Sequence, residues 1–337
     1  MVGKKIVYAF TPQYNRRCAA GLDEQIDRVQ PDLVLGLFEA APLLADVSSP
    51  LPLFMYRDMT PLDSMRMGWY RGTTNRPRRN MRQASQLVRN AVSRCAGIAV
   101  ASDWARQSLV HNYGADAARV VLAPMAANIE PEYVPSRQAV LDRRQGNCCR
   151  MIFVGVDWQR KGGDILVEAF DRLGAMGIRA QLTIVGCTPP PEAIVGRDIK
   201  VIPFLDKTEP TGCRELAALL IQSDFLVVPT RSEAYGIVYA EGNAFGLPAI
   251  GTDVGGVSGV ITDGLNGFRL PLSARGDAYA KVIADLWNDP VRLQAMRVSS
   301  RDEYERRLNW DVWGETMADF FRGFLPPRLA SGIGPSR

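Results

Sequence analysis

Short apolar runs alternate with longer amphipathic stretches along the chain, and this alternation constrains the fold more than any other sequence feature. In the first part of the chain, apolar runs at residues 32–36, 51–56, 97–101 and 120–123 are separated by helical patterns at 22–29, 81–95 and 103–113. Runs that are apolar on both faces indicate buried strands, and their alternation with helices predicts a parallel sheet covered by helices on both sides.

A polar, proline-containing segment from Pro131 to Arg150 interrupts this pattern and indicates a linker or a domain boundary. The alternation then restarts, with strands expected at 151–155, 181–186, 199–203, 225–229 and 248–251, and helices at 163–173, 238–245, 277–287 and 310–324. A length of 337 residues suits two domains of ~150 residues each. The prediction is an α/β fold of two Rossmann-like doubly wound domains, 1–145 and 146–308, a closing helix at 309–326 and a disordered tail at 327–337.

Charge and cysteine usage narrow the range of functions. The net charge of +4 is too small, and its cations too dispersed, to predict nucleic-acid binding. It suits a phosphate-bearing small ligand or an anionic membrane surface. The six cysteines form no C-x-x-C pair, and the single histidine, His111, has no cysteine nearby, so no metal site is expected. This spread favours reduced cysteines in the cytoplasm. No signal peptide or apolar stretch of the ~20 residues that a membrane span needs is found.

The first chemical motif is the segment 153–164, in which a strand leads into a loop with Gly155, then Arg160 and Lys161, then a helix. Backbone N–H groups and the helix dipole at such a junction attract an anion, and two cations add charge and donors. A solvated basic turn is the plainer interpretation. The segment is not a Walker loop, because the order G-x-x-x-x-G-K-[ST] is absent.

The second motif, residues 230–248, follows the strand predicted at 225–229. Glu233 lies in the loop, Gly236 precedes the next helix, and Glu241 lies near its first turn. Free N–H groups after Gly236 would face a phosphate, and a carboxylate can accept two hydrogen bonds from a vicinal diol. Alternatively, Glu233 is merely exposed and Glu241 only complements the helix dipole. A third stretch, 252–259, is a poor dinucleotide fingerprint and reads better as another helix N-terminus.

Two further segments carry charge. Arg57 and Asp58 follow a predicted strand and would touch substrate or form a structural ion pair. Arginines interleaved with aromatic residues between 66 and 82 would bind anionic lipid or an anionic acceptor, or form a solvated loop.

Taken in order, these pieces resemble the donor-binding domain of retaining glycosyltransferase family 4, the glycosyl transferases group 1 family, over residues 151–271. The matching pieces are the strand and cations up to Lys161, Leu-Thr-Ile-Val-Gly186, Ile-Pro203-Phe, the E-x7-E pair Glu233 and Glu241, Phe-Gly246-Leu-Pro248, Gly255-Gly256 and Asp263-Gly-Leu-Asn-Gly267. The segments around 102–104, 113–114 and 124–128 resemble the end of the family's first domain.

The resemblance implies a GT-B fold, with an acceptor-side domain followed by a nucleotide-sugar donor domain and a last helix that crosses back. It implies that Arg160 and Lys161 bind the donor diphosphate, Glu233 the donor sugar and Glu241 the ribose. The further donor contacts that it implies are Gly155, Tyr235, Gly236, Ile237, Val238, Pro203 and Phe204. No metal or other cofactor is implied, and Arg57 and Asp58 are the candidates on the acceptor side.

The chain also departs from the family pattern. Ile6–Phe10 is followed by Thr11-Pro12 instead of a Gly-rich loop, so the first domain is expected to be shortened. His111 does not match the family's first-domain histidine and is expected at the surface.

The resulting hypothesis is a metal-independent retaining glycosyltransferase that moves a hexose from UDP or GDP to a glycan, lipid or small-molecule hydroxyl. Its expected location is the cytoplasm, with peripheral contact to the membrane. Alternatives are a non-catalytic nucleotide-sugar-binding protein, a nicotinamide-dependent dehydrogenase and a membrane scaffold.

Overall fold

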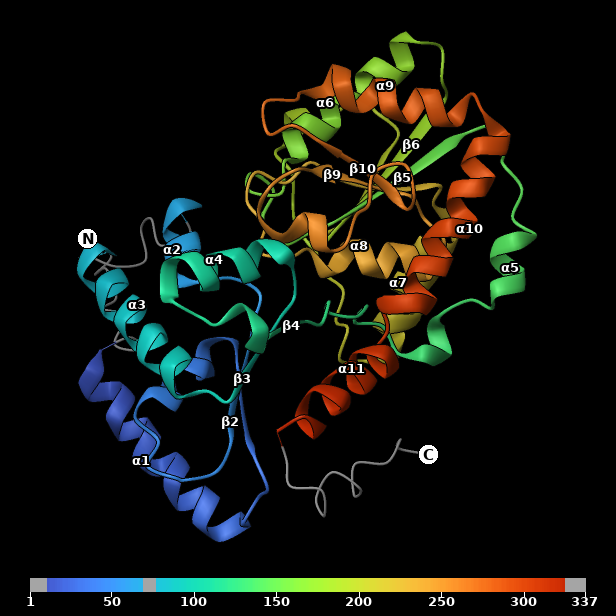
Figure 1. Ribbon diagram of the computed structural model, residues 1–337. Coiled ribbons are helices and arrows are strands. Elements are labelled where there is room, and N and C mark those ends of the chain that lie inside the picture. The colour runs from blue at the N-terminus through green and yellow to red at the C-terminus, as the bar shows by residue number, and fades with distance from the viewer. Residues whose placement is uncertain (1–10, 69–76, 325–337) are drawn as a thin grey trace. The chain divides into compact units, whose positions relative to one another are not determined.

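The computed structural model describes residues 11–68 and 77–324, and these residues separate into two compact units (Figure 1). Unit 1 contains the described residues up to Pro124 and those from Trp313 on, and unit 2 runs from Met125 to Val312. The domain boundary expected from the sequence lies after residue 145, whereas residues 125–145 group with unit 2. The predictions for Ile6–Phe10 and for the tail at 327–337 lie outside the described residues.

Unit 1 is built on a parallel four-stranded sheet with the order β1-β2-β3-β4. Its core gathers apolar side chains such as Leu44, Val88 and Leu109. Its strands are β1 (Val34–Leu37), β2 (Leu53–Arg57), β3 (Gly97–Val100) and β4 (Val120–Leu122). Its helical elements before the boundary are α1 (Pro12–Val29), η2 (Phe38–Ala45), α2 (Pro61–Arg66), α3 (Pro77–Arg94), α4 (Asp103–Tyr113) and η3 (Ala117–Arg119).

Local capping explains where two of these helices begin and end. Thr60 and Asp63 form a reciprocal capping box that starts α2, a helix too short for its apolar period to be recognised in the sequence. Ser102 caps the start of α4, and Gly114 ends that helix with a φ of 74°, a left-handed conformation that favours glycine.

The last helix, α11 (Trp310–Arg322), packs its aromatic side chains on the sheet of unit 1. The rings of Phe320 and Phe321 lie 5.7 and 4.8 Å from the ring of Phe54 on β2, centroid to centroid. Gly97 on β3 makes room for them, because a Cβ there would lie 2.5 Å from the Phe320 ring. Figure 1 shows α11 on the side of this sheet opposite to α3 and α4.

Truncating Phe54 is therefore expected to destabilise unit 1. The Phe54→Ala variant should lose about 3 to 5 kcal/mol of unfolding free energy, because Phe54 is fully buried and its removal leaves a cavity. Urea unfolding followed by circular dichroism measures the loss. The matched control is Phe204→Ala, which truncates a ring that is 74% exposed and should change stability by less than about 0.5 kcal/mol. Equal losses in the two variants would contradict the packing argument.

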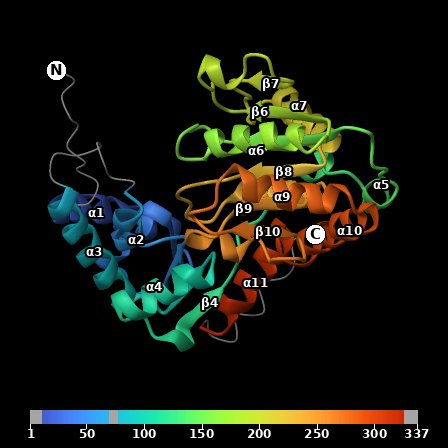
Figure 2. The same cartoon turned by 90° about the horizontal axis from the view of Figure 1, so that it is seen from above.

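Unit 2 is a parallel six-stranded sheet with the order β10-β9-β8-β5-β6-β7. In Figure 1, α6 and α9 cover one face of this sheet, while α7 and α8 lie on the other. Figure 2 looks onto the side of the sheet that carries α6 and α9. Its strands are β5 (Cys149–Val154), β6 (Ala180–Val185), β7 (Ile199–Ile202), β8 (Phe225–Val228), β9 (Ala249–Thr252) and β10 (Gly267–Leu270). Its helical elements are η4 (Pro131–Tyr133), α5 (Arg137–Leu141), α6 (Gly163–Ala175), η5 (Pro191–Ala193), α7 (Pro210–Gln222), α8 (Ile237–Ala244), η6 (Gly255–Gly259), α9 (Gly276–Trp287) and α10 (Pro290–Arg307).

The expectations for unit 2 were wrong or incomplete in several places, and the helix α7 and the strand β10 are among the elements that were not predicted. The segment 131–150 is not a free linker, because Val140 is buried and the carbonyl of Pro135 accepts a hydrogen bond from Arg301. The helix α10 was not expected at all. Its buried face carries more polar residues than apolar ones, and Arg297 is neutralised there by Asp224 at 2.6 Å. Apolar periodicity therefore gives only a weak signal for this helix.

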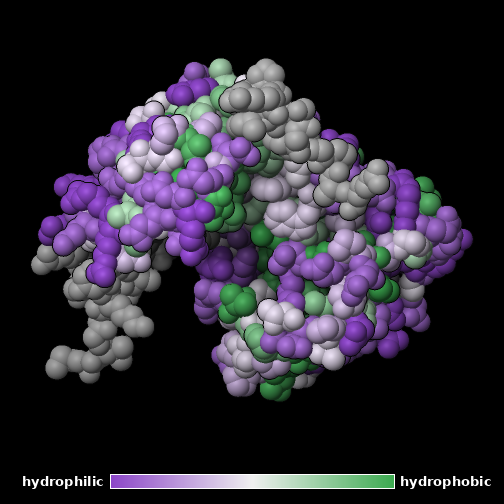
Figure 3. Space-filling model, turned by 90° about the horizontal axis from the view of Figure 1, so that it is seen from below, coloured by the Kyte–Doolittle hydropathy of each residue, from purple (hydrophilic) through white to green (hydrophobic). Residues whose placement is uncertain are grey.

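The surface is mostly hydrophilic on the face shown in Figure 3, where apolar residues are scattered among polar ones. Among the described residues, no helix is long and apolar enough to cross a membrane.

Candidate functional site

The candidate site of unit 2 lies at the carboxyl edge of its sheet, where the loops after β5, β7 and β8 begin. Because all six strands are parallel, these loops emerge at the same edge. Ligands of doubly wound sheets bind at that edge. The residues that the sequence analysis selected in unit 2 lie in or next to these three loops and at the start of α8.

A buried ion pair joins two of the loops. Lys161, which ends the loop after β5, forms an ion pair with Glu233 in the loop after β8, although 72 residues separate them in the chain. Both residues are buried, with 9% and 7% of their surfaces exposed. Gly155 allows this arrangement, because a Cβ on it would lie only 3.0 Å from Cγ of Lys161. The pair places a cation and a carboxylate within one small polar centre.

Further contacts fix these loops to one another. The Arg160 guanidinium donates to the Ser232 carbonyl at 3.0 Å. Arg231 contacts both carboxylate oxygens of Asp164 at 2.7 and 2.6 Å. Burial alone would raise the pKa of Asp164, but the hydrogen bonds and charges of Arg231 and Arg275 lower it. These contacts hold Arg160 and Lys161 against the loop that carries Glu233.

The start of α8 provides free backbone donors. Gly236 caps the helix with a φ of 93°, and a Cβ there would lie 2.6 Å from the Tyr239 ring, so this position requires glycine. In the described part of the chain, the N–H groups of Ile237 and Val238 have no backbone acceptor, as expected for a first turn. These N–H groups and the helix dipole favour an anion at this end of α8.

Glu241, on α8, is paired with a lysine that the sequence analysis did not select. Its Oε1 lies 2.6 Å from Nζ of Lys207, in the loop after β7. Only 5% of Glu241 is exposed, and burial raises the pKa of its carboxyl group, while the charges of Lys207 and Lys161 oppose that rise. Since Lys161 acts on both carboxylates, Glu233 and Glu241 share one electrostatic environment.

The remaining predicted donor residues flank this centre. Pro203 and Phe204 follow β7, and the Phe204 ring is 74% exposed, which leaves a face on which a base can stack. Tyr235 is buried, and its hydroxyl donates to the carbonyl of Met125 at 3.0 Å, so its side chain serves the packing of unit 2. The third sequence motif became the short helix η6, whose Gly256 N–H donates to the Ala234 carbonyl in the loop after β8.

The acceptor-side candidates lie at the carboxyl end of β2 in unit 1. The Arg57 guanidinium donates to the carbonyls of Met59 and Phe38 at 2.9 and 2.8 Å, so several of its donors are engaged by the fold. Burial raises the pKa of the neighbouring Asp58 carboxyl group. His111 is exposed on α4, as expected for a surface residue.

Two members of the site were missed because their roles depend on long-range contacts. Lys207 lies in a polar loop without a motif, and Arg231 follows Thr230 directly without any charge pattern. Only the position of the loop after β7, at the same sheet edge, could have pointed to Lys207. No group of three or more metal-ligating side chains was found among the described residues.

The arrangement suits a ligand with a diphosphate and hydroxyl-bearing rings on each side of it. Two cations and a helix N-terminus attract the phosphates, while Glu233 and Glu241 are 7% and 5% exposed and lie in one polar centre.

Solved structures share the fold of this chain. Sucrose-phosphate synthase from Thermosynechococcus elongatus matches with a TM-score of 0.71 and 17% identity, covering 94% of this chain and 79% of that protein. HepE from Anabaena in complex with UDP and glucose matches with a TM-score of 0.67 and 16% identity, covering 91% and 82%. The chain has the GT-B fold of these glycosyltransferases, as the sequence predicted.

The family follows from the sequence of unit 2. Residues 149–289 match the sequence model of the glycosyl transferases group 1 family. The match covers the segment in which the motifs were found, and it confirms the resemblance to the glycosyl transferases group 1 family that was drawn from them.

Named relatives extend over more of the chain. A D-inositol 3-phosphate glycosyltransferase from Arthrobacter sp. (strain FB24) is 29% identical over 192 residues, which are 54% of this chain and 45% of the relative. A GDP-mannose-dependent alpha-(1-6)-phosphatidylinositol monomannoside mannosyltransferase from Mycolicibacterium smegmatis is 28% identical over 240 residues, 68% of this chain and 63% of that protein. The chain spans about half the length of the first of these relatives.

Proposed function

We propose that the protein is a retaining glycosyltransferase that moves a hexose from a nucleoside-diphosphate sugar to an acceptor hydroxyl. The observation that carries this proposal is the buried centre that Lys161 and Glu233 form between two loops, beside the free N–H groups of α8. The family match and the named glycosyltransferase relatives support the same reaction class.

In the proposed reaction, the bond between the anomeric carbon and the diphosphate oxygen breaks while a bond to the acceptor oxygen forms on the same face of the sugar. Arg160, Lys161 and the N–H groups of Ile237 and Val238 stabilise the negative charge that grows on the leaving diphosphate. Glu233 holds the hydroxyls of the donor sugar, and Glu241 those of the ribose. The acceptor proton passes to the leaving phosphate, so the proposal requires no side chain as a general base.

The donor is proposed to be a UDP- or GDP-hexose, whose base lies near Pro203 and Phe204. The acceptor hydroxyl belongs to a glycan, a lipid or a small molecule, with Asp58 and Arg57 on the acceptor side. Because cations and helix N–H groups offset the diphosphate charge, the proposed reaction needs no metal ion. We propose the cytoplasm as its compartment, in keeping with six cysteines that are all free.

A direct assay tests this function. The protein is incubated with UDP-glucose, UDP-galactose or GDP-mannose, with and without EDTA, and release of UDP or GDP is followed. Slow hydrolysis of one donor, unchanged by EDTA and giving the sugar first in the anomeric configuration of the donor, is the expected result. Thermal shift with UDP and GDP measures binding separately, because a ligand stabilises the folded state by mass action.

The same assay separates the alternatives. Tight binding of a nucleotide sugar without turnover, across a panel of glycan and lipid acceptors, would favour the non-catalytic binding protein over the transferase. Failure of both nucleotides to stabilise the protein would refute the donor site itself.

A further inference from the structure

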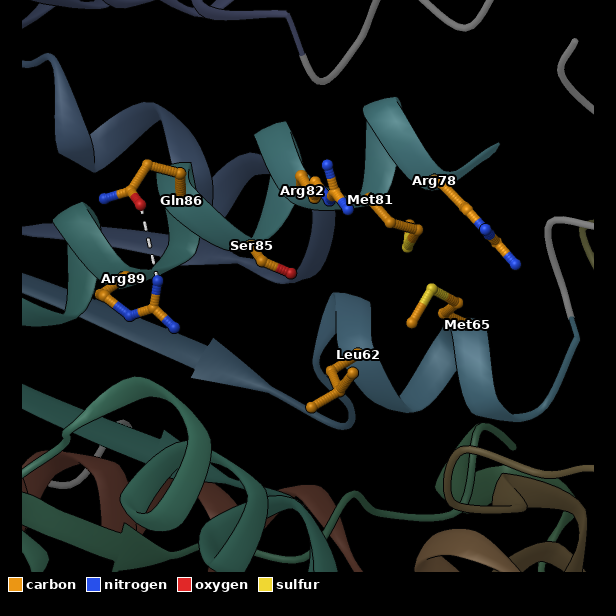
Figure 4. A pocket seen from close by; sticks show the side chains of 8 residues that line it. All are labelled: Leu62, Met65, Arg78, Met81, Arg82, Ser85, Gln86 and Arg89. Atoms are coloured by element: carbon orange, nitrogen blue, oxygen red, sulfur yellow. Dashed lines mark hydrogen bonds between the residues drawn. The ribbon is translucent and has the colours of Figure 1, made fainter. Parts of the chain in front are cut away.

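Unit 1 contains a pocket that the proposed reaction does not use. It has a volume of about 530 Å³ and lies between α2 and α3 (Figure 4). The residues that line it are Leu62, Met65, Arg78, Met81, Arg82, Ser85, Gln86 and Arg89. Within the described residues, the lining combines three arginines with three apolar side chains and contains no carboxylate.

The apolar part of the lining faces the space between the two helices. In Figure 4, the side chains of Met65 from α2 and Met81 from α3 point toward one another across this space. Met81 is buried, whereas Met65 is 43% exposed and therefore open to a ligand. Methionine side chains are flexible and adapt to apolar ligands of varied shape.

The arginines follow one face of α3, because residues 78, 82 and 89 recur at helical spacing. Arg89 is engaged by the fold: it donates to the carbonyl of Asn112 at 3.1 Å and lies over the ring of Tyr113. In contrast, Arg78 and Arg82 are exposed and have no hydrogen-bond or ion-pair partner in the part of the chain that the structure describes. Two unpaired guanidinium groups at the rim of an apolar pocket favour a ligand that is both anionic and apolar.

We propose that this pocket binds the phosphate-bearing head of an anionic phospholipid. The phosphate contacts Arg78 and Arg82, and the adjoining apolar part of the lipid lies against Met65 and Met81. This second ligand site belongs to unit 1 and does not rest on the proposed transfer reaction.

Co-sedimentation with vesicles tests the proposal without any nucleotide, so failure of the donor site cannot affect the outcome. The protein should bind vesicles of phosphatidylglycerol and phosphatidylcholine, and bind vesicles of phosphatidylcholine alone weakly. The Arg78→Gln/Arg82→Gln variant should lose roughly tenfold or more in affinity for the anionic vesicles, since each cation near an anionic surface contributes to binding. These side chains are exposed, so the variant should keep its circular dichroism spectrum and melting temperature.

The matched control is Arg16→Gln/Arg17→Gln, which removes two exposed cations from α1 in the same unit. The affinity of this control for the anionic vesicles should fall by less than about twofold. A fall equal to that of the pocket variant would overturn the site in favour of general charge attraction. Met65→Gln keeps the charge and should weaken binding severalfold, whereas unchanged binding would overturn the role of the apolar lining. Monomeric dihexanoyl-phosphatidylglycerol should bind more tightly than inorganic phosphate. Equal binding of the two would identify a phosphate site and refute the lipid site.

Discussion

Replacing Arg160 and Lys161 together is expected to lower the rate of sugar transfer, or of donor hydrolysis, by about a thousandfold or more. Removal of one preorganised donor to a developing oxyanion typically costs a factor of about 10² to 10³, and this change removes two. The variant Arg160→Gln/Lys161→Met retains the side-chain length that packs against Gly155, where a Cβ would touch the lysine stem. Donor turnover at saturating nucleotide sugar measures the effect, because the growing charge on the leaving group affects kcat more than donor binding.

The substitution of Lys161 has a structural consequence that the design must separate from catalysis. Loss of the cation leaves the buried carboxylate of Glu233 unpaired, which can destabilise a fold by about 3 to 5 kcal/mol. A second variant, Lys161→Met/Glu233→Gln, removes both charges and should recover the melting temperature without recovering activity.

A control at the opposite edge of the same sheet tests whether net charge alone matters. Arg150 on β5 and Lys200 on β7 are exposed and lie near the amino ends of their strands. The variant Arg150→Gln/Lys200→Gln carries the same change of net charge and should retain full activity. Full activity in the Arg160→Gln/Lys161→Met variant would refute the phosphate role of these two residues.

The second large effect is expected at Glu241. Glu241→Gln should weaken the binding of UDP or GDP by about ten- to a hundredfold, because charged acceptors make the stronger hydrogen bonds to hydroxyl groups. Glutamine has nearly the same shape, and Lys207 is 34% exposed, so water can solvate the lysine once its partner is neutral. Isothermal titration calorimetry with the nucleoside diphosphate measures the change, and unchanged affinity would remove Glu241 from the site.

The pair of Glu241 and Lys207 also predicts how donor binding depends on pH. A carboxylate accepts hydrogen bonds from a diol, whereas its protonated form loses acceptor capacity, so affinity should fall as pH falls through the pKa of Glu241. Burial raises that pKa and Lys207 opposes the rise, so the acid limb begins at a higher pH than for an exposed glutamate. In the Lys207→Met variant, the fall of donor affinity at low pH should begin at a still higher pH, and Lys207→Arg should return it to the pH of the unchanged protein. In the Glu241→Gln variant, this fall should be absent. A purely structural role for Lys207 would lower stability in Lys207→Met and leave the pH profile unmoved.

Much of unit 2 could be predicted because its determinants are local. The strands β5, β6 and β8 are short apolar runs, and each is read from a few neighbouring residues. Gly236 marks the start of α8 because a left-handed φ at a helix cap favours glycine. Among the elements that were missed, α10 has only a weak signal, because it buries Arg297 and Glu303 on ion pairs beside few apolar residues. The helix α7 was missed although it buries Leu216 and Leu220.

The sequence alone predicts the α/β alternation, the order of the motifs and the grouping of Arg160, Lys161, Glu233 and Glu241 in one site. How these residues pair depends on the packing of separate elements. Lys161 meets Glu233 across 72 residues, and Lys207 meets Glu241 across 34, because parallel strands bring the ends of distant loops to one sheet edge. The spacing of residues in the sequence shows only which side chains lie on the same face of one helix or strand. The burial that raises the pKa of Glu241 and the ion pair that opposes this rise arise only when separate elements pack together.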